Sequence, residues 1–290
     1  MPRARAREAR GAGLRRMSSS LSAPLFAVWS GFVKDHFGLS YGPVESELLG
    51  EKLWARAQEA GFVNLLDYYY YLRYDAGSSE ELDALADALV VGESYLFREL
   101  AQIEAAVDGF IAPAVAARGR ARVWSAACAA GEEPLTLAMA LARRGLLDRV
   151  QIIASDLSRR ALARAAQHTW SRRALRSEPL PEYRRFLEVT DDKVRVSPSL
   201  ATAIEWRRFN LVGDDRSNLP RDLDVIFCRN VMIYFDDATV TATVARLTEA
   251  LRPGGALFVG VSESLLRYGV GLVCEEHDGV FVYRKAPVSP

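Results

Sequence analysis

The feature that most constrains the fold is a series of short apolar segments in the second half of the chain, separated by helical patterns. Strands are predicted at residues 122–126, 150–154, 223–227, 256–260 and 280–283. Helices are predicted at residues 133–144, 158–167 and 237–251. Because strands that are apolar on both faces must be covered on both sides, this alternation predicts a doubly wound α/β domain with a mostly parallel sheet. A ligand is expected beyond the carboxyl ends of its strands.

Residues 23–90 show a different pattern, in which apolar side chains recur every three or four positions. That spacing predicts helices only, interrupted at Gly42-Pro43 and Gly61. The run of four tyrosines from Tyr68 to Tyr71 is interpreted as core and rim residues of a helix. The alternative, a platform on which nucleic-acid bases stack, is less favoured at this spacing.

These patterns predict a small all-helical domain followed by the α/β domain, with an inserted antiparallel β-subdomain. The predicted divisions are a basic arm at 1–20, the helical domain at 21–90, a linker helix region at 91–120, the α/β domain at 121–285 and the insertion at 170–209. The arm contains six arginines and a single glutamate within its first 16 residues, so it resembles a transit peptide in composition. It lacks the apolar stretch of a secretory signal, and Met17 is an alternative start, so the arm is left out of the fold.

Composition excludes several classes of function. The 37 basic and 37 acidic side chains balance, which argues against a nucleic-acid binder. No unbroken apolar run approaches the ~18 to 20 residues of a membrane span, so neither membrane insertion nor a location outside the cytoplasm is expected. Three widely separated cysteines and three histidines provide no spacing for a metal site or a disulfide framework.

The predicted strand ends carry acidic side chains. The turn at residues 126–134 has one glycine and two carboxylates, Glu132 and Glu133, which would repel a pyrophosphate but suit a cationic ligand. Asp156 ends the second strand, where a carboxylate can accept both hydroxyls of a ribose. Together they indicate S-adenosyl-L-methionine as the cofactor. Two plainer interpretations stay open: acids at an ordinary helix N-terminus, and Asp156 as a helix cap.

Three longer strings resemble one family, the CheR-type chemotaxis receptor methyltransferases. They are Val-Val-Gly-Glu-Ser-Tyr-Leu-Phe-Arg-Glu at 90–99, the turn at 125–134, and Phe-Cys-Arg-Asn-Val-Met-Ile-Tyr-Phe-Asp at 227–236. The tail segments 251–255 and Ser262-Glu263-Ser264 resemble the same family. The resemblance implies a protein that methylates glutamate side chains on chemoreceptor cytoplasmic helices, giving γ-glutamyl methyl esters.

The resemblance also implies roles for residues on the amino-terminal side of the pocket. Ser94 and Arg98 would hold the carboxylate end of the cofactor. Glu132 would contact its amino group, and Asp156 its ribose. Arg98 is also a candidate for orienting the acceptor glutamate.

Five further positions follow from the same resemblance. Asn210 and Leu211 would frame the adenine, and Arg229 and Asn230 would complete the pocket. Tyr234 would lie next to the transferred methyl group. Because the acceptor carboxylate is already ionised at neutral pH, no general base is needed, and catalysis would consist of in-line positioning in a dry pocket.

The implied partner is the cytoplasmic domain of a chemoreceptor. Relatives that dock on receptor helices have a row of arginines on one N-terminal helix, where this chain keeps only Lys52 and Arg56 as candidate substrate-binding residues. The hairpin at 188–193 is short and lacks a glycine-rich loop, which makes tethering to a receptor C-terminal pentapeptide doubtful.

Two alternative functions remain open on sequence grounds. One is a catalytically silent relative that acts as a binding or scaffold module. The other is a methyltransferase for small molecules or nucleic acids, for which an Asn/Asp-Pro-Pro-Tyr string is expected where this chain has Cys228-Arg229-Asn230-Val231.

Overall fold

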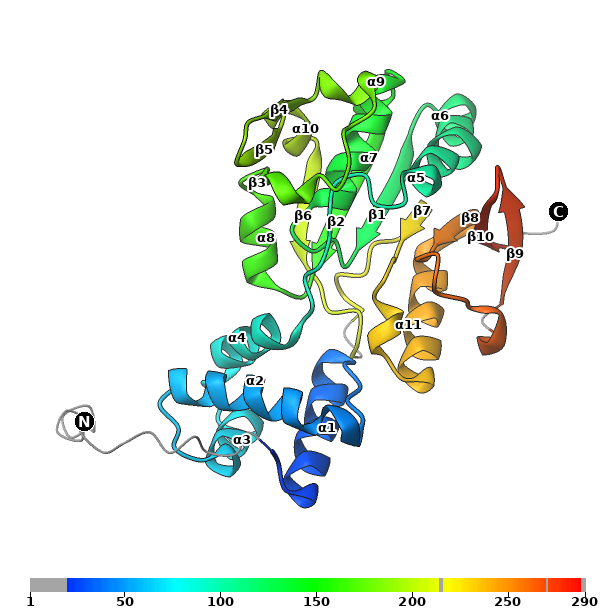
Figure 1. Ribbon diagram of the computed structural model, residues 1–290. Coiled ribbons are helices and arrows are strands. Elements are labelled where there is room, and N and C mark those ends of the chain that lie inside the picture. The colour runs from blue at the N-terminus through cyan, green and yellow to red at the C-terminus, as the bar shows by residue number, and fades with distance from the viewer. Residues whose placement is uncertain (1–19, 214–215, 270, 288–290) are drawn as a thin grey trace.

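A computed structural model describes residues 20–213, 216–269 and 271–287. The predicted basic arm lies outside the described residues except for Ser20. Figure 1 shows a cluster of helices at the amino-terminal end and a larger domain built around a central sheet. The connection between them runs through the segment that follows helix α4 (Ser79–Leu89).

The amino-terminal domain is all-helical, as the periodicity predicted. Its helices are α1 Ala23–Phe37, η1 Pro43–Glu45, α2 Ser46–Glu59, α3 Leu65–Tyr74 and α4 Ser79–Leu89. Local signals set their ends: Gly38 closes α1 with a φ of 76°, and the Asn64 side chain caps α3 by accepting from the Asp67 N–H. The apolar faces meet in one core that includes Trp29, Leu49, Leu53, Tyr68 and Leu85.

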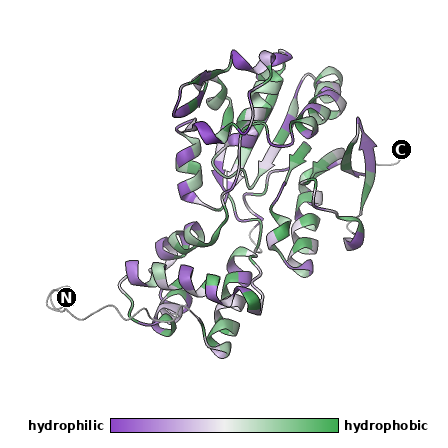
Figure 2. Cartoon of the chain, in the orientation of Figure 1, coloured by the Kyte–Doolittle hydropathy of each residue, from purple (hydrophilic) through white to green (hydrophobic). Residues whose placement is uncertain are grey.

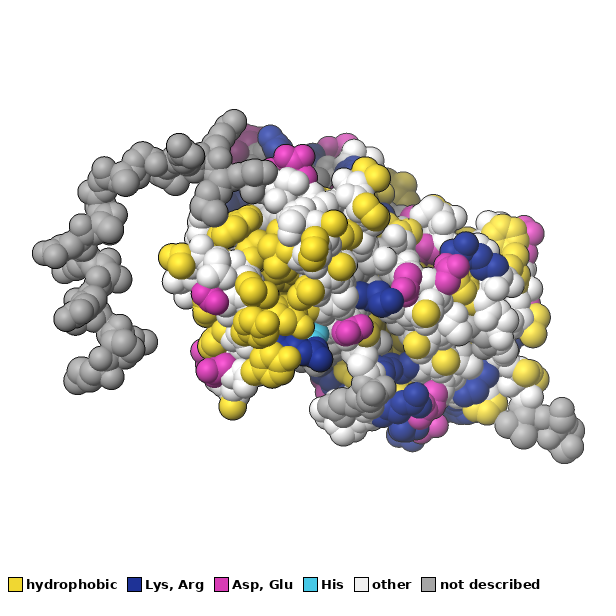
Figure 3. Space-filling view, turned by 90° about the horizontal axis from the view of Figure 1, so that it is seen from below, with side chains coloured by type: hydrophobic (Ala, Val, Ile, Leu, Met, Phe, Trp, Pro, Cys, Tyr) yellow, Lys and Arg dark blue, Asp and Glu magenta, His cyan; other side chains and the backbone are white. Residues whose placement is uncertain are grey.

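The tyrosine run divides between core and surface. Tyr68 is fully buried and its hydroxyl donates to Glu81 at 2.7 Å, whereas Tyr70 is half exposed. Tyr70, Tyr74 and Leu66 lie four residues apart on one exposed face of α3, and apolar side chains gather on this side of the molecule in Figure 3. The interpretation of these tyrosines as core and rim residues is confirmed.

A mixed seven-stranded sheet forms the second domain, in the order β6-β2-β1-β7-β8-β10-β9. Its strands are β1 Ala121–Ala126, β2 Val150–Asp156, β6 Ile204–Arg208, β7 Leu223–Phe227, β8 Leu251–Phe258, β9 Leu272–His277 and β10 Val280–Lys285. The first five strands of that order pair in parallel, and β10 and β9 pair antiparallel. The predicted doubly wound α/β fold is confirmed.

Both faces of the sheet are covered by helices. On one face, α7 Glu132–Arg143 and the stretch α5 Leu100–Ala106, η2 Val107–Ile111 and α6 Ala112–Arg118 share a core with the strands. On the other face, α11 Asp237–Ala250 packs its buried side chains on the strands. Alternate residues of β1 show this division, since Val123 lies in the first core and Trp124 in the second.

The stretch Leu100–Arg118 is a helix of 19 residues that is long and apolar enough to cross a membrane by length and composition alone. It lies within the linker helix region predicted at 91–120, and Gln102, Glu104 and Asp108 interrupt its apolar run. Half of the stretch is buried, and Ile103 belongs to the core beneath the sheet. The stretch is therefore a core helix of the second domain.

The insertion differs in part from the prediction. A separate antiparallel sheet consists of β3 Thr169–Ser171, β5 Lys193–Val196 and β4 Leu187–Val189, in that order. Residues 203–206 were predicted to belong to it, but residues 204–206 instead lie in β6, which pairs in parallel with β2. Strand β6 lies at the edge of the sheet and is less buried than the central strands, so its residues are more polar, which explains the error. The edge strand β9 was not predicted either, and Figure 2 colours it partly as hydrophobic and partly as hydrophilic.

Candidate active site

A pocket lies at the carboxyl ends of β1, β2 and β7, as the fold predicted. Its walls come from the segment that follows α4, the turn after β1, the end of β2 and the loop after β7. Phe37 and Leu39 of the helical domain complete the lining. The pocket is therefore formed jointly by both domains.

Strained backbone clusters around this pocket. Positive φ angles occur at Phe97 (65°), Glu99 (49°), Ala127 (61°), Ala129 (49°) and Asn230 (59°), none of which is glycine. Residues with side chains adopt this conformation at a cost, and such conformations persist where the surrounding structure enforces them. Three separate loops are thus held in shapes that place their backbone at the pocket wall.

Asp156 ends β2 and lines the pocket with 9% of its surface exposed. One carboxylate oxygen accepts from the Ser158 N–H at 2.9 Å, and the other accepts from the Ala129 N–H at 2.8 Å. Burial raises the pKa of Asp156, and these hydrogen bonds oppose that shift. Helix α8 (Arg159–Ala165) is capped by Ser158, so Asp156 is not its cap, and both carboxylate oxygens keep a lone pair for a ligand.

Glu132 is buried at the start of α7, beneath the turn after β1. Burial raises the pKa of its carboxyl, and a hydrogen bond with the Ser94 side chain acts in the opposite direction. Its Oε2 atom has no hydrogen-bond partner among the described residues. A buried acceptor without a partner is costly, and a cationic amino group would satisfy it. The site therefore fits the amino end of S-adenosylmethionine.

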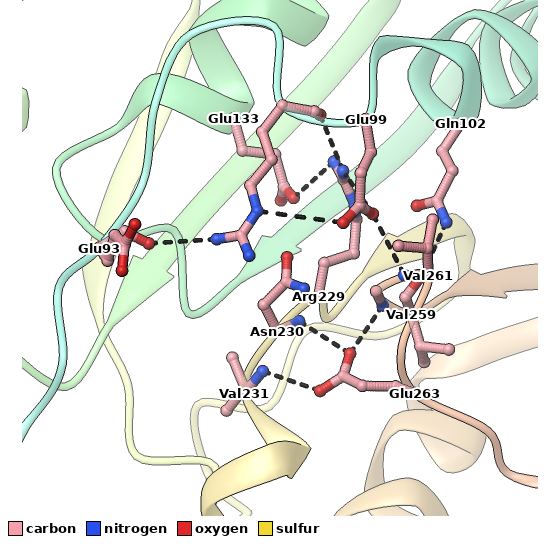
Figure 4. A network of polar contacts seen from close by, with 12 residues as sticks. Glu93, Glu99, Gln102, Glu133, Arg229, Asn230, Val231, Val259, Val261 and Glu263 are labelled. Atoms are coloured by element: carbon pink, nitrogen blue, oxygen red, sulfur yellow. Dashed lines mark hydrogen bonds and ion pairs between the residues drawn. The ribbon is translucent and has the colours of Figure 1, made fainter. Parts of the chain in front are cut away.

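Figure 4 shows a network of ion pairs around Arg229, which was not predicted from the sequence. The Arg229 side chain is 1% exposed and contacts Glu99 at 3.0 Å and Glu133 at 3.1 Å. It also donates to the Arg98 carbonyl at 2.8 Å, while Glu133 accepts from the Ser125 hydroxyl at 2.6 Å. The Arg229 side chain, predicted to complete the pocket, thus ties three segments of the pocket wall together.

Arg98 and Tyr234 both line the pocket. The Arg98 guanidinium donates to the Glu93 carbonyl at 3.2 Å and lies 4.0 Å from a Glu99 carboxylate oxygen, which leaves donors free. Burial raises the pKa of Tyr234, so its hydroxyl stays protonated at neutral pH. The structure therefore places in one pocket Arg98, a candidate for orienting the acceptor, and Tyr234, predicted to lie next to the transferred methyl group.

Asn210, Leu211 and Asn230 also line the pocket. The Asn210 amide donates to the His36 carbonyl at 2.8 Å and accepts from the Val212 N–H at 3.0 Å. The Asn210 side chain therefore joins the two domains, and the buried Leu211 supplies apolar surface beside it.

Lys52 and Arg56 lie away from the pocket and are engaged within the helical domain. Lys52 donates to the Leu89 carbonyl at 2.8 Å, and burial lowers its pKa. Arg56 makes two hydrogen bonds of 2.6 Å to Glu81 and one of 2.7 Å to Glu59. The spacing of Lys52 and Arg56 along α2 did not predict these hydrogen bonds.

The fold and the acidic pocket define a methyltransferase that uses S-adenosylmethionine. Residues 92–271 match the CheR methyltransferase SAM binding domain, and residues 24–90 match the CheR methyltransferase all-alpha domain. The chain therefore belongs to the CheR methyltransferase family. It is an S-adenosylmethionine-dependent protein-glutamate methyltransferase of the chemosensory class.

Similar proteins span most of the chain. Chemotaxis protein methyltransferase 2 of Vibrio cholerae is 32% identical over 81% of this chain and 84% of its own length. Chemotaxis protein methyltransferase 2 of Pseudomonas aeruginosa is 34% identical over 79% of this chain and 82% of its own. Among solved structures, magnesium protoporphyrin IX methyltransferase from Synechocystis is 13% identical, with a TM-score of 0.36 over 81% of this chain and 97% of that one.

Proposed function

We propose that this protein methylates glutamate side chains on the cytoplasmic helices of a chemoreceptor, in the cytoplasm, as the adaptation step of a chemosensory pathway. The observation that carries the proposal is the pocket. Asp156 with spare acceptor capacity, Arg98 and Tyr234 line it, and Glu132, which bonds to the pocket-lining Ser94, has a buried oxygen with no partner among the described residues.

The pocket residues have distinct proposed roles in holding the cofactor. Glu132 binds the amino group and Asp156 binds the two ribose hydroxyls, because both are buried carboxylates with free lone pairs. Ser94 and Arg98 hold the carboxylate end. Leu211 supports the adenine through its apolar side chain, and the backbone beside it completes that wall.

When bound, S-adenosylmethionine supplies a methyl group on a sulfonium. The acceptor glutamate has a pKa of about 4.3 in water, so it enters the pocket ionised and needs no base. Arg98 orients one carboxylate oxygen through its planar donors, while the protonated Tyr234 hydroxyl can donate to the same group. The chain thus contributes alignment and exclusion of water rather than proton transfer.

The competing functions are supported less well. A silent scaffold would have no need for a buried acceptor without a partner or for strained loops around an open pocket. A methyltransferase for bases would stack an aromatic ring at the end of β7, where this chain places Arg229 within an ion-pair network.

The mode of receptor docking is a proposal with two parts. The turn between β4 and β5 spans only residues 190–192, so we propose that methylation does not depend on a receptor C-terminal pentapeptide. Lys52 and Arg56 remain candidate contacts on α2, although their present partners lie within the helical domain.

Transfer of a labelled methyl group tests the function. The purified protein would be incubated with methyl-labelled S-adenosylmethionine and a chemoreceptor cytoplasmic fragment, and the label then released with alkali. Methyl esters give volatile methanol, and changing the methylated glutamates of the fragment to alanine should abolish the signal. Alkali-stable label, or the absence of transfer to any receptor from a genome that encodes this protein, would contradict the proposal.

A further inference from the structure

The loop after β7 is held by one carboxylate that has no part in the roles described above. Glu263 Oε2 accepts from the backbone N–H of Asn230 at 2.7 Å and of Gly260 at 2.6 Å. Its Oε1 accepts from the N–H of Val231 at 2.9 Å and of Met232 at 2.8 Å. Figure 4 shows the Glu263 side chain reaching from the loop after β8 to Asn230 and Val231 in the loop after β7.

We propose that Glu263 is a positioning residue for methyl transfer, which acts by fixing the loop that carries Asn230 and Tyr234. The proposal rests on the proposed function of the pocket. Three consecutive N–H groups of this loop converge on one carboxylate, and the short helix η5 (Met232–Tyr234) begins within it. Glu263 therefore fixes the start of the helix that carries Tyr234, although the two side chains lie on different loops.

The local backbone requires an acceptor of this kind. Asn230 has a φ of 59°, a conformation that is unfavourable for a residue with a side chain. Convergent N–H groups form a concave site for an anion, and a carboxylate can accept from all four of them. Gly260 faces the same site, since a Cβ there would lie 2.9 Å from both Asn230 Cγ and Glu263 Oε2.

The other end of the loop is held by the helical domain. The Tyr234 carbonyl accepts from the Ser40 N–H at 2.8 Å, and Asp236 pairs with Lys34 at 3.0 Å. The loop is thus fixed on one side by Glu263 and on the other by the amino-terminal domain. Loss of Glu263 should release the end that carries Asn230, while the contacts with the helical domain remain.

A double-mutant cycle on the full chain tests this role. Glu263→Gln keeps the size of the side chain but turns an amide NH₂ toward N–H donors. We expect kcat for receptor methylation to fall by about 10- to 100-fold, with a much smaller change in affinity for S-adenosylhomocysteine measured by calorimetry. In a Tyr234→Phe background, Glu263→Gln should lower kcat far less, because the hydroxyl contact that Glu263→Gln misplaces is already absent.

Two further variants, Glu276→Gln and Glu263→Gly, distinguish this role from a general effect on the fold. Glu276→Gln removes an exposed carboxylate from β9 and should leave kcat unchanged. In Glu263→Gly, added formate should restore activity in a saturable way by occupying the vacated anion site, and chloride should not. A folded Glu263→Gln protein with the parent kcat, or an equal cost in both Tyr234 backgrounds, would overturn the proposal. A parent protein that binds S-adenosylhomocysteine but transfers no methyl group would instead contradict the proposed function.

Discussion

The pocket and helix α2 both carry charged residues that the sequence marked as functional, and the structure treats them differently. Glu132, beside the pocket and bonded to the pocket-lining Ser94, keeps a buried oxygen with no partner among the described residues. Arg56 on α2 has carboxylate partners on Glu81 and Glu59, and Lys52 donates to a backbone carbonyl. We infer that a charged side chain is available to a ligand where the fold leaves hydrogen-bonding capacity of that side chain unused. Four experiments test that distinction.

The largest effect is expected from Arg229→Leu, because Arg229 is the buried cation that pairs with Glu99 and Glu133. The change leaves Glu99 and Glu133 mostly buried without their cation, so we expect the free energy of unfolding to fall by about 3–5 kcal/mol. Urea denaturation measures the loss. Arg73→Leu, which removes an exposed arginine of α3, serves as the control. A loss below about 1 kcal/mol would show that the network is no stronger than a surface ion pair.

Asp156→Ala tests a charge that we assign to the ligand. Loss of the paired hydrogen bonds to the ribose should weaken S-adenosylhomocysteine binding by roughly 1.5–3 kcal/mol, or about 10- to 150-fold. Calorimetry gives the affinity, and thermal unfolding reports the separate loss of the contacts with Ala129 and Ser158. The exposed Asp192→Ala is the matched control. Unchanged affinity in a folded Asp156→Ala protein would remove the ribose assignment.

The double change Lys52→Glu, Arg56→Glu asks whether α2 also contacts a receptor. If it does, methylation of an acidic receptor should fall more at low salt than at high salt, because attraction is screened beyond ~10 Å at 0.1 M. We expect this salt-dependent loss, together with unchanged cofactor affinity and a lower stability caused by the new charge near Glu81. Equal relative rates at both salt concentrations would limit the two residues to a structural role.

The smallest effect is expected from pH. With a preformed carboxylate as nucleophile and ~4.3 as its usual pKa, the methyl-transfer rate should stay flat from about pH 6.5 to 8.5. Burial raises the pKa of Glu132, so this carboxyl gains its proton at a higher pH than an exposed glutamate as the solution becomes acidic. Affinity for the cationic amino group should therefore fall on the acid side. A bell-shaped rate profile centred near neutrality would indicate a base in the reaction.

Local patterns predicted most of the fold because they report burial directly. The strands β1, β2 and β7 lie in the centre of the sheet, so they are apolar on both faces and were found from the sequence. The edge strands β6 and β9 are less buried than the central strands, so their apolar pattern is weaker. As a result, β6 was assigned to the wrong sheet and β9 was not predicted.

The sequence predicted which residues form the site, but it did not predict the contacts that hold them in place. Strand ends and the family strings pointed to Glu132, Asp156, Arg98 and Tyr234, and all four lie at or beside one pocket. The spacing of residues along the chain did not predict the ion-pair partners of Arg229 or the four hydrogen bonds of Glu263. The string Ser262-Glu263-Ser264 supported the family resemblance, but it predicted no role for Glu263.

The sequence by itself determined the two domains, the central parallel sheet, the acidic strand ends and the choice of a cationic adenosine cofactor. These follow from periodicity and from the polarity of short segments, which depend on neighbours along the chain. Only the tertiary structure decided which charges remain free for a ligand. That choice depends on residues far apart in sequence, such as Arg229 with Glu99 and Glu133, because the free energy of a buried charge is set by the partners that the fold brings to it.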